Sequence, residues 1–316
     1  MAKVGEKIAT RQAYGSALLA LGKADSSVVV LGADLNVSMN QTGFAKAFPE
    51  RFFNFGISEQ DMVSTAAGLA WSGKTVFAGT FAIFMEIAFE RARQSIARPS
   101  LNVKLVGGHA GLLTGEDGES AHAMLDLALF RGLPNFTVVF PADATETEKA
   151  VLALSKLKAP AYLRVCRGKT PVFFGDDHPF QLGKAHVVRD GGDATIVSTG
   201  PILSEALQAA AALEKEGVSA RVINMHTIKP LDKETLLKAA RDTGVIVTIE
   251  DHSIIGGLGS AVSEVLSENY PVPLFRVGVR DTFTESGTPE ELYRKYGLTA
   301  DNVVRAVKNL LVGKRN

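Results

Sequence analysis

The sequence predicts an α/β protein with two domains, each built on a parallel sheet with flanking helices. Short apolar runs rich in β-branched residues alternate with longer Ala- and Leu-rich amphipathic segments, as strands alternate with covering helices in such folds. The chain has 316 residues, which is long for a single hydrophobic core. Because 46% of the residues are hydrophobic, the chain can bury sizeable cores.

The first half contains five apolar runs of strand length, separated by segments with the composition of helices. We expect strands at Val28–Leu31, Val76–Ala78, Val103–Gly107, Phe136–Phe140 and Tyr162–Val165. We expect helices at Arg11–Leu21, Glu59–Ser72, Glu86–Ile96 and Thr145–Ser155.

The alternation breaks near residues 167–190, where Gly, Pro and Asp are frequent, and we expect a linker with one short strand or hairpin there. The break divides the chain into a first domain at 1–168, a linker at 169–190 and a second domain at 191–316. A second series follows, with strands expected at Thr195–Ser198, Ala220–Asn224, Val245–Ile249 and Leu274–Val277. Its helices are expected at Ser204–Lys215, Gly257–Ser267, Pro289–Tyr296 and Asp301–Leu311.

The composition argues against several classes of protein. Lys plus Arg number 34 and Asp plus Glu number 34, so the chain lacks the basic surface of a general nucleic-acid binder. The single cysteine, Cys166, excludes a disulfide framework and any CxxC zinc or redox motif, and it fits a reducing cytoplasm. No apolar run approaches the roughly 18 residues of a membrane span, and the N-terminus has no signal-peptide core.

Gly-rich and polar segments follow four of the strands expected in the first half. They are GADLNVSMN after Leu31, GTFAIFME after Ala78, GHAGLLTGEDGESAH after Gly107 and CRGK after Val165. Ligands of open parallel sheets bind beyond the carboxyl ends of the strands. The sequence therefore predicts an active site in the first half.

Three residues of the first half, Glu59, Phe81 and Phe84, have both a structural and a functional interpretation. Glu59 would stand at the first position of a helix capped by Ser58, where an acid suits the helix dipole whether or not it has a chemical role. Phe81 and Phe84 are three residues apart, so they would share a helical face, either as core or as the wall of a planar ligand.

The charged and histidine candidates also have two interpretations each when they are considered one at a time. His109, Asp117 and His122 could suggest a metal site, but their spacing matches no compact zinc pattern, so we expect no metal bound by this chain alone. Arg11 and Arg167 are ordinary surface cations unless they converge, in which case they suit bidentate phosphate recognition.

Taken together, the motifs resemble those of the C-terminal half of transketolase, from IATRQA at 8–13 to DNVV at 301–304. The resemblance is carried, in order and spacing, by ADLNVS (33–38), FGISEQDM (55–62), GTFAIF (79–84), HAGLLTGEDG (109–118), RGLPN (131–135), PADATE (141–146), TFTESGTPEELY (282–293) and YGLTADNVV (296–304). It implies a thiamine diphosphate-binding pyrimidine domain followed by a transketolase C-terminal α/β domain.

The resemblance also implies a partner. Transketolases bind the cofactor's diphosphate through Mg²⁺ and a GDG motif of an N-terminal domain, and this sequence has no GDG. We therefore expect one subunit of a two-chain enzyme, inactive without an N-terminal transketolase subunit, in an α2β2 heterotetramer. Thiamine diphosphate would lie between the chains, and Mg²⁺ would be bound mainly by the partner subunit.

By the same resemblance, Glu59 would be the catalytic glutamate that activates the cofactor through a ring nitrogen of its pyrimidine. Phe84 would stack on that ring with Phe81 beside it, and Asp34 would lie in the cofactor region. Ile87 stands where many members have a tyrosine against the pyrimidine, and an apolar wall tolerates this change.

Family members bind the phosphate of a sugar with two arginines, a serine and a histidine. The matching positions are Arg11, Arg167, Ser38 and His109, and all four have the expected residue type. Asp117 would contact hydroxyl groups of the sugar. These matches imply sugar phosphate substrates.

One departure concerns the donor sugar. Ala121 stands where the family has a histidine that touches the reacting end of the ketose, and His122 follows one position later. Either His122 takes over that role as a substrate-binding residue, or the enzyme uses a specialised donor.

The resemblance implies transfer of a two-carbon ketol unit from a ketose phosphate to an aldose acceptor. Deoxyxylulose-phosphate synthase and the β subunits of 2-oxo acid dehydrogenases, which share the domain order, are the nearest alternatives. A non-catalytic relic of the fold is a third, because fold alone does not guarantee activity.

Overall fold

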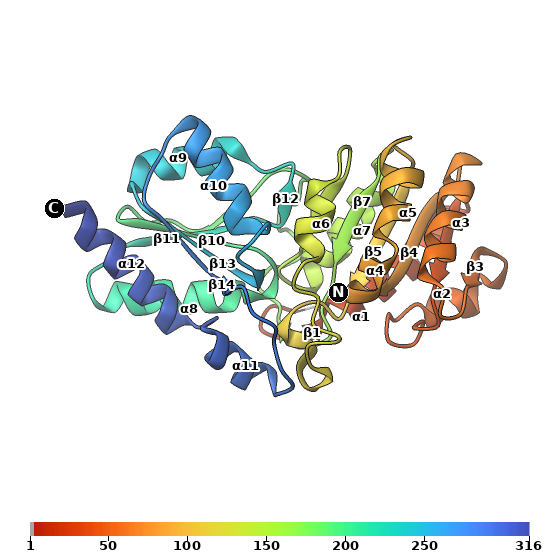
Figure 1. Ribbon diagram of the computed structural model, residues 1–316, viewed down its shortest axis with the longest axis horizontal. Helices are drawn as coiled ribbons and strands as arrows, with labels where there is room; N and C mark the ends of the chain where they lie inside the picture. Colours follow the sequence, from red (N-terminus) through yellow and green to blue (C-terminus); the bar gives the residue numbers. More distant parts are fainter. Residues whose placement is uncertain (1–2, 316) are drawn as a thin grey trace.

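Two sheets lie side by side along the longest axis of the computed structural model, which describes residues 3–315, and helices cover both faces of each sheet (Figure 1). The first half of the chain builds most of one sheet and the second half builds the other. The α/β fold class expected from the sequence is confirmed.

The first sheet has the strand order β12-β6-β7-β5-β4-β2-β3, and all neighbours are parallel except the pair β12 and β6. Its strands are β2 (Val28–Gly32), β3 (Phe52–Asn54), β4 (Thr75–Phe81), β5 (Val103–Gly108), β6 (Thr137–Val139), β7 (Ala161–Arg164) and β12 (Thr227–Lys229). Because β12 follows the linker in sequence, the second half of the chain supplies the last strand of the first sheet.

The apolar strands of this sheet are buried on both faces, which explains why they are continuous hydrophobic runs. In β2, Val28 and Val30 belong to the core beside α1 and α7, whereas Val29 and Leu31 belong to the core beside α3. The first face is covered by α1 (Thr10–Ala24), α2 (Thr42–Ala47) and α7 (Ala144–Lys156), and the second by α3 (Glu59–Trp71), α4 (Ala82–Ile87), α5 (Phe89–Arg91) and α6 (Asp126–Gly132).

The second sheet has the order β14-β13-β10-β11-β9, with only β9 antiparallel to its neighbour. Its strands are β9 (His186–Arg189), β10 (Ala194–Ser198), β11 (Ala220–Asn224), β13 (Ile246–Ser253) and β14 (Leu274–Val279). Its helices are α8 (Leu203–Lys215) and α12 (Ala300–Arg315) on one face, α9 (Lys233–Thr243) and α10 (Leu258–Asn269) on the other, and α11 (Pro289–Tyr296) beside the first domain (Figure 1).

Several elements differ from the sequence expectation. The helix expected at Glu86–Ile96 begins earlier, at Ala82, and is broken into α4, α5 and a π-helical segment at Ala92–Ala97. The linker contains β8 (Lys169–Pro171), which pairs with β1 (Lys7–Ala9), as well as β9. Helices α2, α6 and α9 and strands β1, β3 and β12 were not expected.

Three short 3₁₀ helices complete the described part of the chain, at Pro49–Arg51, Leu112–Asp117 and Gly200–Ile202. The second of these lies in the Gly-rich loop that follows β5 and so belongs to the predicted site. Within residues 3–315, no helix is both long enough and apolar enough to cross a membrane.

Candidate active site

The carboxyl ends of four parallel strands bring most of the expected site residues to one edge of the first sheet. Asp34 and Ser38 follow β2, Phe81 ends β4, His109 follows β5, and Arg167 follows β7. The strand order places β5 between β4 and β7, so these loops are neighbours although the sequence separates them widely.

Arg11, from the first turn of α1, connects two of these loops. Its Nη1 donates to the carbonyl oxygen of Ser38 at 2.7 Å and contacts Nε2 of His109 at 3.3 Å. A guanidinium can only donate, so Nε2 is the acceptor and the imidazole carries its proton on Nδ1. Burial and the positive charges of Arg11 and Arg167 lower the pKa of His109 to about 3, so the ring is neutral.

Two buried donors at this position have no partner among the described residues. They are Nε of Arg11 and Nδ1 of His109. Leaving a buried donor unsatisfied costs about 1–3 kcal/mol. The two donors belong to the same arginine–histidine contact, so the hydrogen-bonding capacity of that contact is not used up within the described chain.

Arg167, unlike Arg11, forms an ion pair within the chain. Its Nη1 donates to the carboxylate of Asp117 at 2.9 Å and to the carbonyl oxygen of Thr114 at 3.0 Å. Both side chains of the ion pair are partly exposed. The pair closes the Gly-rich loop against the end of β7 and brings two expected substrate-binding residues into contact.

An aromatic stack lines the same edge. The rings of Phe81 and Phe84 are parallel within 7° with centroids 5.6 Å apart, and the imidazole of His109 stacks on Phe81 at 3.7 Å. The stack connects His109, which is expected to bind phosphate, to Phe81 and Phe84, which are expected to contact a heterocycle.

Glu59 begins α3 and is buried, with 8% of its surface exposed. Its carboxylate has no hydrogen-bond partner in the described part of the chain. Ser58 is the N-cap residue as expected, but its side chain makes no capping hydrogen bond. The next residue, Gln60, donates to the carbonyl oxygen of Ile87 at 3.4 Å, so the start of α3 lies beside the exposed end of α4.

Asp34 is exposed at the surface of the loop after β2. It adopts a left-handed backbone conformation (φ 59°), and its N–H donates to the side-chain oxygen of Asn54 at 2.9 Å. Asn54 ends β3 and was not singled out from the sequence. It connects the loop after β2 to Gly56 at the start of the motif that carries Glu59.

His122 is buried and bonds the Gly-rich loop and the second domain. Its Nε2 faces the carbonyl oxygen of Gly115 at 2.9 Å and its Nδ1 faces the hydroxyl of Thr284 at 2.8 Å. Because a carbonyl only accepts, Nε2 carries the proton and Nδ1 accepts from Thr284. Both ring nitrogens thus have partners within the chain.

His109, Asp117 and His122 have three different sets of partners, and the described residues contain no group of three or more side chains that could hold a metal ion.

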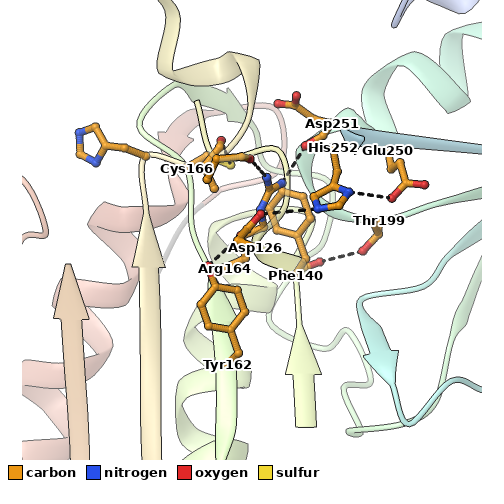
Figure 2. A network of polar contacts seen from close by, with 12 residues as sticks. Asp126, Phe140, Tyr162, Arg164, Cys166, Thr199, Glu250, Asp251 and His252 are labelled. Carbon is orange, nitrogen blue, oxygen red and sulfur yellow. Dashed lines mark hydrogen bonds and ion pairs between the residues drawn. The ribbon is translucent and has the colours of Figure 1, made fainter. Parts of the chain in front are cut away.

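A buried polar network behind the site was not anticipated from the sequence. Arg164, fully buried at the end of β7, donates to Asp126 at 2.8 Å and to the carbonyl oxygens of Ala123 and Asp251 at 2.8 and 2.9 Å (Figure 2). Tyr162 also donates to Asp126, at 2.7 Å. The available signal was an arginine within the apolar strand sequence AYLRV, because a buried charge requires partners.

Comparison with known proteins identifies the family. The transketolase pyrimidine binding domain matches residues 6–172, and the transketolase C-terminal domain matches residues 183–303. A putative transketolase C-terminal section from Methanocaldococcus jannaschii is 43% identical over 94% of this chain and 94% of its own length.

Longer relatives and a solved structure agree with this match. Transketolase from Rattus norvegicus is 42% identical over 98% of this chain, which spans only 50% of that protein. The structure of a split gene transketolase, solved as an inactive β4 tetramer, has 51% identity and a TM-score of 0.91, covering 96% of this chain and 99% of that one. The chain therefore belongs to the transketolase family, in which it corresponds to the C-terminal section of a split transketolase.

Proposed function

We propose that this chain is one subunit of a thiamine diphosphate-dependent transketolase, which transfers a two-carbon ketol unit from a ketose phosphate to an aldose acceptor. The observation that carries the proposal is the Arg11–His109 contact, in which Arg11 Nε and His109 Nδ1 are buried donors without a partner among the described residues, and which is continued by the stack of His109, Phe81 and Phe84. Activity would require an N-terminal transketolase subunit, and we propose an α2β2 assembly.

The phosphate end of the substrate would be bound by Arg11, His109 and Arg167. Two guanidinium groups supply charge-assisted hydrogen bonds, and the neutral imidazole supplies a further donor at Nδ1. A phosphate dianion accepts several hydrogen bonds at once, so it suits a site where several donors converge. Ser38 lies within the same group through its contact with Arg11.

The cofactor end fits thiamine diphosphate. A flat heterocycle matches the stacked rings of Phe81 and Phe84 and the exposed apolar side chain of Ile87. When bound, this cofactor supplies the electron sink that stabilises a two-carbon carbanion. Mg²⁺ and most of the diphosphate contacts are assigned to the partner subunit.

Glu59 would hold a proton at its carboxyl oxygens, at the hydrogen-bonding edge of the heterocycle. Its burial favours this role, because a carboxyl that is poorly accessible to water keeps a strong hydrogen bond to a ring nitrogen. Asp117 would orient sugar hydroxyls from the Gly-rich loop, where its pairing with Arg167 holds it.

Two further observations fit the proposal, one on the cellular compartment and one on the partner. The one cysteine, Cys166, is an unpaired buried thiol, which suits a reducing compartment. The β4 tetramer of the split gene relative is described as inactive, in keeping with a requirement for a second chain.

The test is reconstitution. This chain is mixed with the N-terminal subunit encoded by the same genome, together with thiamine diphosphate and Mg²⁺, and ketol transfer between sugar phosphates is measured. We expect activity from the mixture and none from either chain alone. Release of carbon dioxide from pyruvate without ketol transfer would instead indicate a synthase or 2-oxo acid dehydrogenase type of enzyme. Failure of the pair to bind the cofactor would indicate a non-catalytic protein.

A further inference from the structure

We propose that Asp251, in the second domain, is a positioning residue for the loop that carries His109 and Asp117. This inference rests on the proposed function, because that function gives the loop its substrate contacts. It assigns a specific task to the second domain, which otherwise supplies no residue to the group around Arg11.

The carboxylate of Asp251 binds the backbone of the loop directly. Oδ1 accepts the N–H of Leu112 at 2.8 Å, and Oδ2 accepts the N–H of Leu113 at 3.3 Å. These are the first two residues of the 3₁₀ helix Leu112–Asp117, whose opening N–H groups have no partner within their own helix. Asp251 therefore caps the helix from another domain.

The backbone approaches Asp251 so closely that only glycine fits. Gly111 has φ +77°, and a Cβ atom placed on it would lie 2.3 Å from Oδ2 of Asp251. Both the left-handed conformation and the short distance require a residue without a side chain. The contact therefore depends on Gly111 in the loop as well as on Asp251.

Short connections lead from the capped amides to His109. The hydroxyl of Thr114 donates to the carbonyl oxygen of His109 at 2.6 Å, and the N–H of Thr114 donates to the carbonyl oxygen of Gly111 at 3.1 Å. His109 itself has φ 52°, a left-handed conformation that a non-glycine residue keeps only when its surroundings impose it. Releasing the capped amides would remove part of that constraint.

Asp251 is itself held from two sides. Arg164 donates to its backbone carbonyl oxygen at 2.9 Å (Figure 2), and the hydroxyl of Tyr293 in α11 donates to Oδ2 at 3.1 Å. The side chain is 1% exposed, so water does not compete for the carboxylate. The cap is therefore a fixed element of the interface between the two domains.

Asp251→Asn tests the proposal with almost no change in volume. Whichever way the amide is oriented, one of the two loop N–H groups faces an NH₂ donor instead of an oxygen. We expect hydrogen exchange of residues 109–118 in the full chain to become at least about threefold faster, the effect of losing one ordinary hydrogen bond. Tyr293→Phe is the matched control, because it removes one bond to Asp251 and leaves both capped amides in place.

In the reconstituted pair, we expect Asp251→Asn to raise KM for a phosphorylated acceptor by about threefold or more, and to raise it less for an unphosphorylated one, which the loop would contact through Asp117 alone. Unchanged exchange in residues 109–118 would overturn the proposal, as would equal losses on both acceptors. The exchange measurement needs no catalysis, so a wild-type pair without ketol transfer would contradict the proposed function and leave the capping result standing.

Discussion

Arg11 donates to Nε2 of His109 across 3.3 Å, and this one contact decides where the imidazole carries its proton. The proton remains on Nδ1, which is buried and has no partner among the described residues. With two arginines nearby, a neutral imidazole contributes a hydrogen-bond donor without adding a third positive charge. The ring can therefore serve an anion without destabilising the guanidinium groups beside it.

We expect His109→Phe to make the protein less sensitive to acid. The pKa of His109 is lowered from 6.5 to about 3 by burial and by Arg11 and Arg167. As pH falls through 6.5 the unfolded chain binds a proton that the folded chain refuses, so wild-type stability decreases between pH 6.5 and 3. The Phe variant lacks this loss, which amounts to about 2 kcal/mol at pH 5.

Urea unfolding of both proteins near neutral pH and near pH 5 measures the difference. The variant retains an aromatic ring to stack on Phe81, and any constant effect of the substitution cancels when the two pH values are compared. An identical pH dependence in the two proteins would show that His109 is not held neutral.

Glu59→Gln tests the cofactor end of the site. The amide is nearly isosteric but cannot hold or release a proton, so we expect turnover of the reconstituted pair to fall by about 10²–10⁴-fold. Sedimentation should show normal assembly with the partner subunit, because the side chain makes no hydrogen bond within the described chain. Near-normal turnover would remove Glu59 from its proposed role.

Arg167→Ala tests the phosphate end. A hydrogen bond to a charged group is worth about 1.5–3 kcal/mol, so we expect KM for a phosphorylated acceptor to rise about 10- to 100-fold. An unphosphorylated acceptor should be affected far less. Steady-state kinetics of the reconstituted pair on the two acceptors measure the contrast.

Arg305→Ala is the control for this experiment, since Arg305 is an exposed arginine on α12 in the second domain. It should leave both KM values unchanged. If Arg167→Ala weakened both acceptors equally, Arg167 would not recognise phosphate, and its pairing with Asp117 would be its main contribution.

Most strands of the two sheets could be predicted from the sequence because parallel strands are buried on both faces and so form apolar runs. Helix α9 also had readable signals, an N-cap at Asp232 and a left-handed Gly244 after its last turn. Its buried residues Leu236, Ala239, Ala240 and Thr243 also have the spacing of one helical face, so this helix could have been predicted. Strand β12 has three residues and pairs with a strand far away in sequence, so no local pattern indicates it.

The candidate residues at the strand ends could be found from sequence because the fold class itself says where ligands bind. The partners of those residues could not. Thr284, which hydrogen-bonds the ring of His122, lies 162 positions away from it in the sequence. Asp251, which accepts the N–H of Leu112, lies 139 positions away from that residue. Such contacts are set by how the two domains pack, and no spacing within either domain carries that information.

Glu86 lies near the end of α4, with Oε1 buried and without a partner among the described residues. Burial, together with the negative charge of Asp126, raises the pKa of Glu86 to about 8. Below the unfolded value of 4.5 both states are protonated, and the group has no effect on stability. As pH rises from 4.5 towards 8, the unfolded chain releases a proton that the folded chain keeps, so the free energy of unfolding decreases.

Glu86→Gln should remove this dependence, because glutamine is neutral in both states. We expect the variant to gain on the order of 3 kcal/mol relative to wild type between pH 5 and pH 8. Urea unfolding at the two pH values measures the gain, and Glu268→Gln, an exposed position on α10, is the control that should follow wild type. If the Glu86 variant followed wild type as well, the folded protein would ionise this carboxyl at ordinary pH, and a cation or water inside the fold would have to stabilise it.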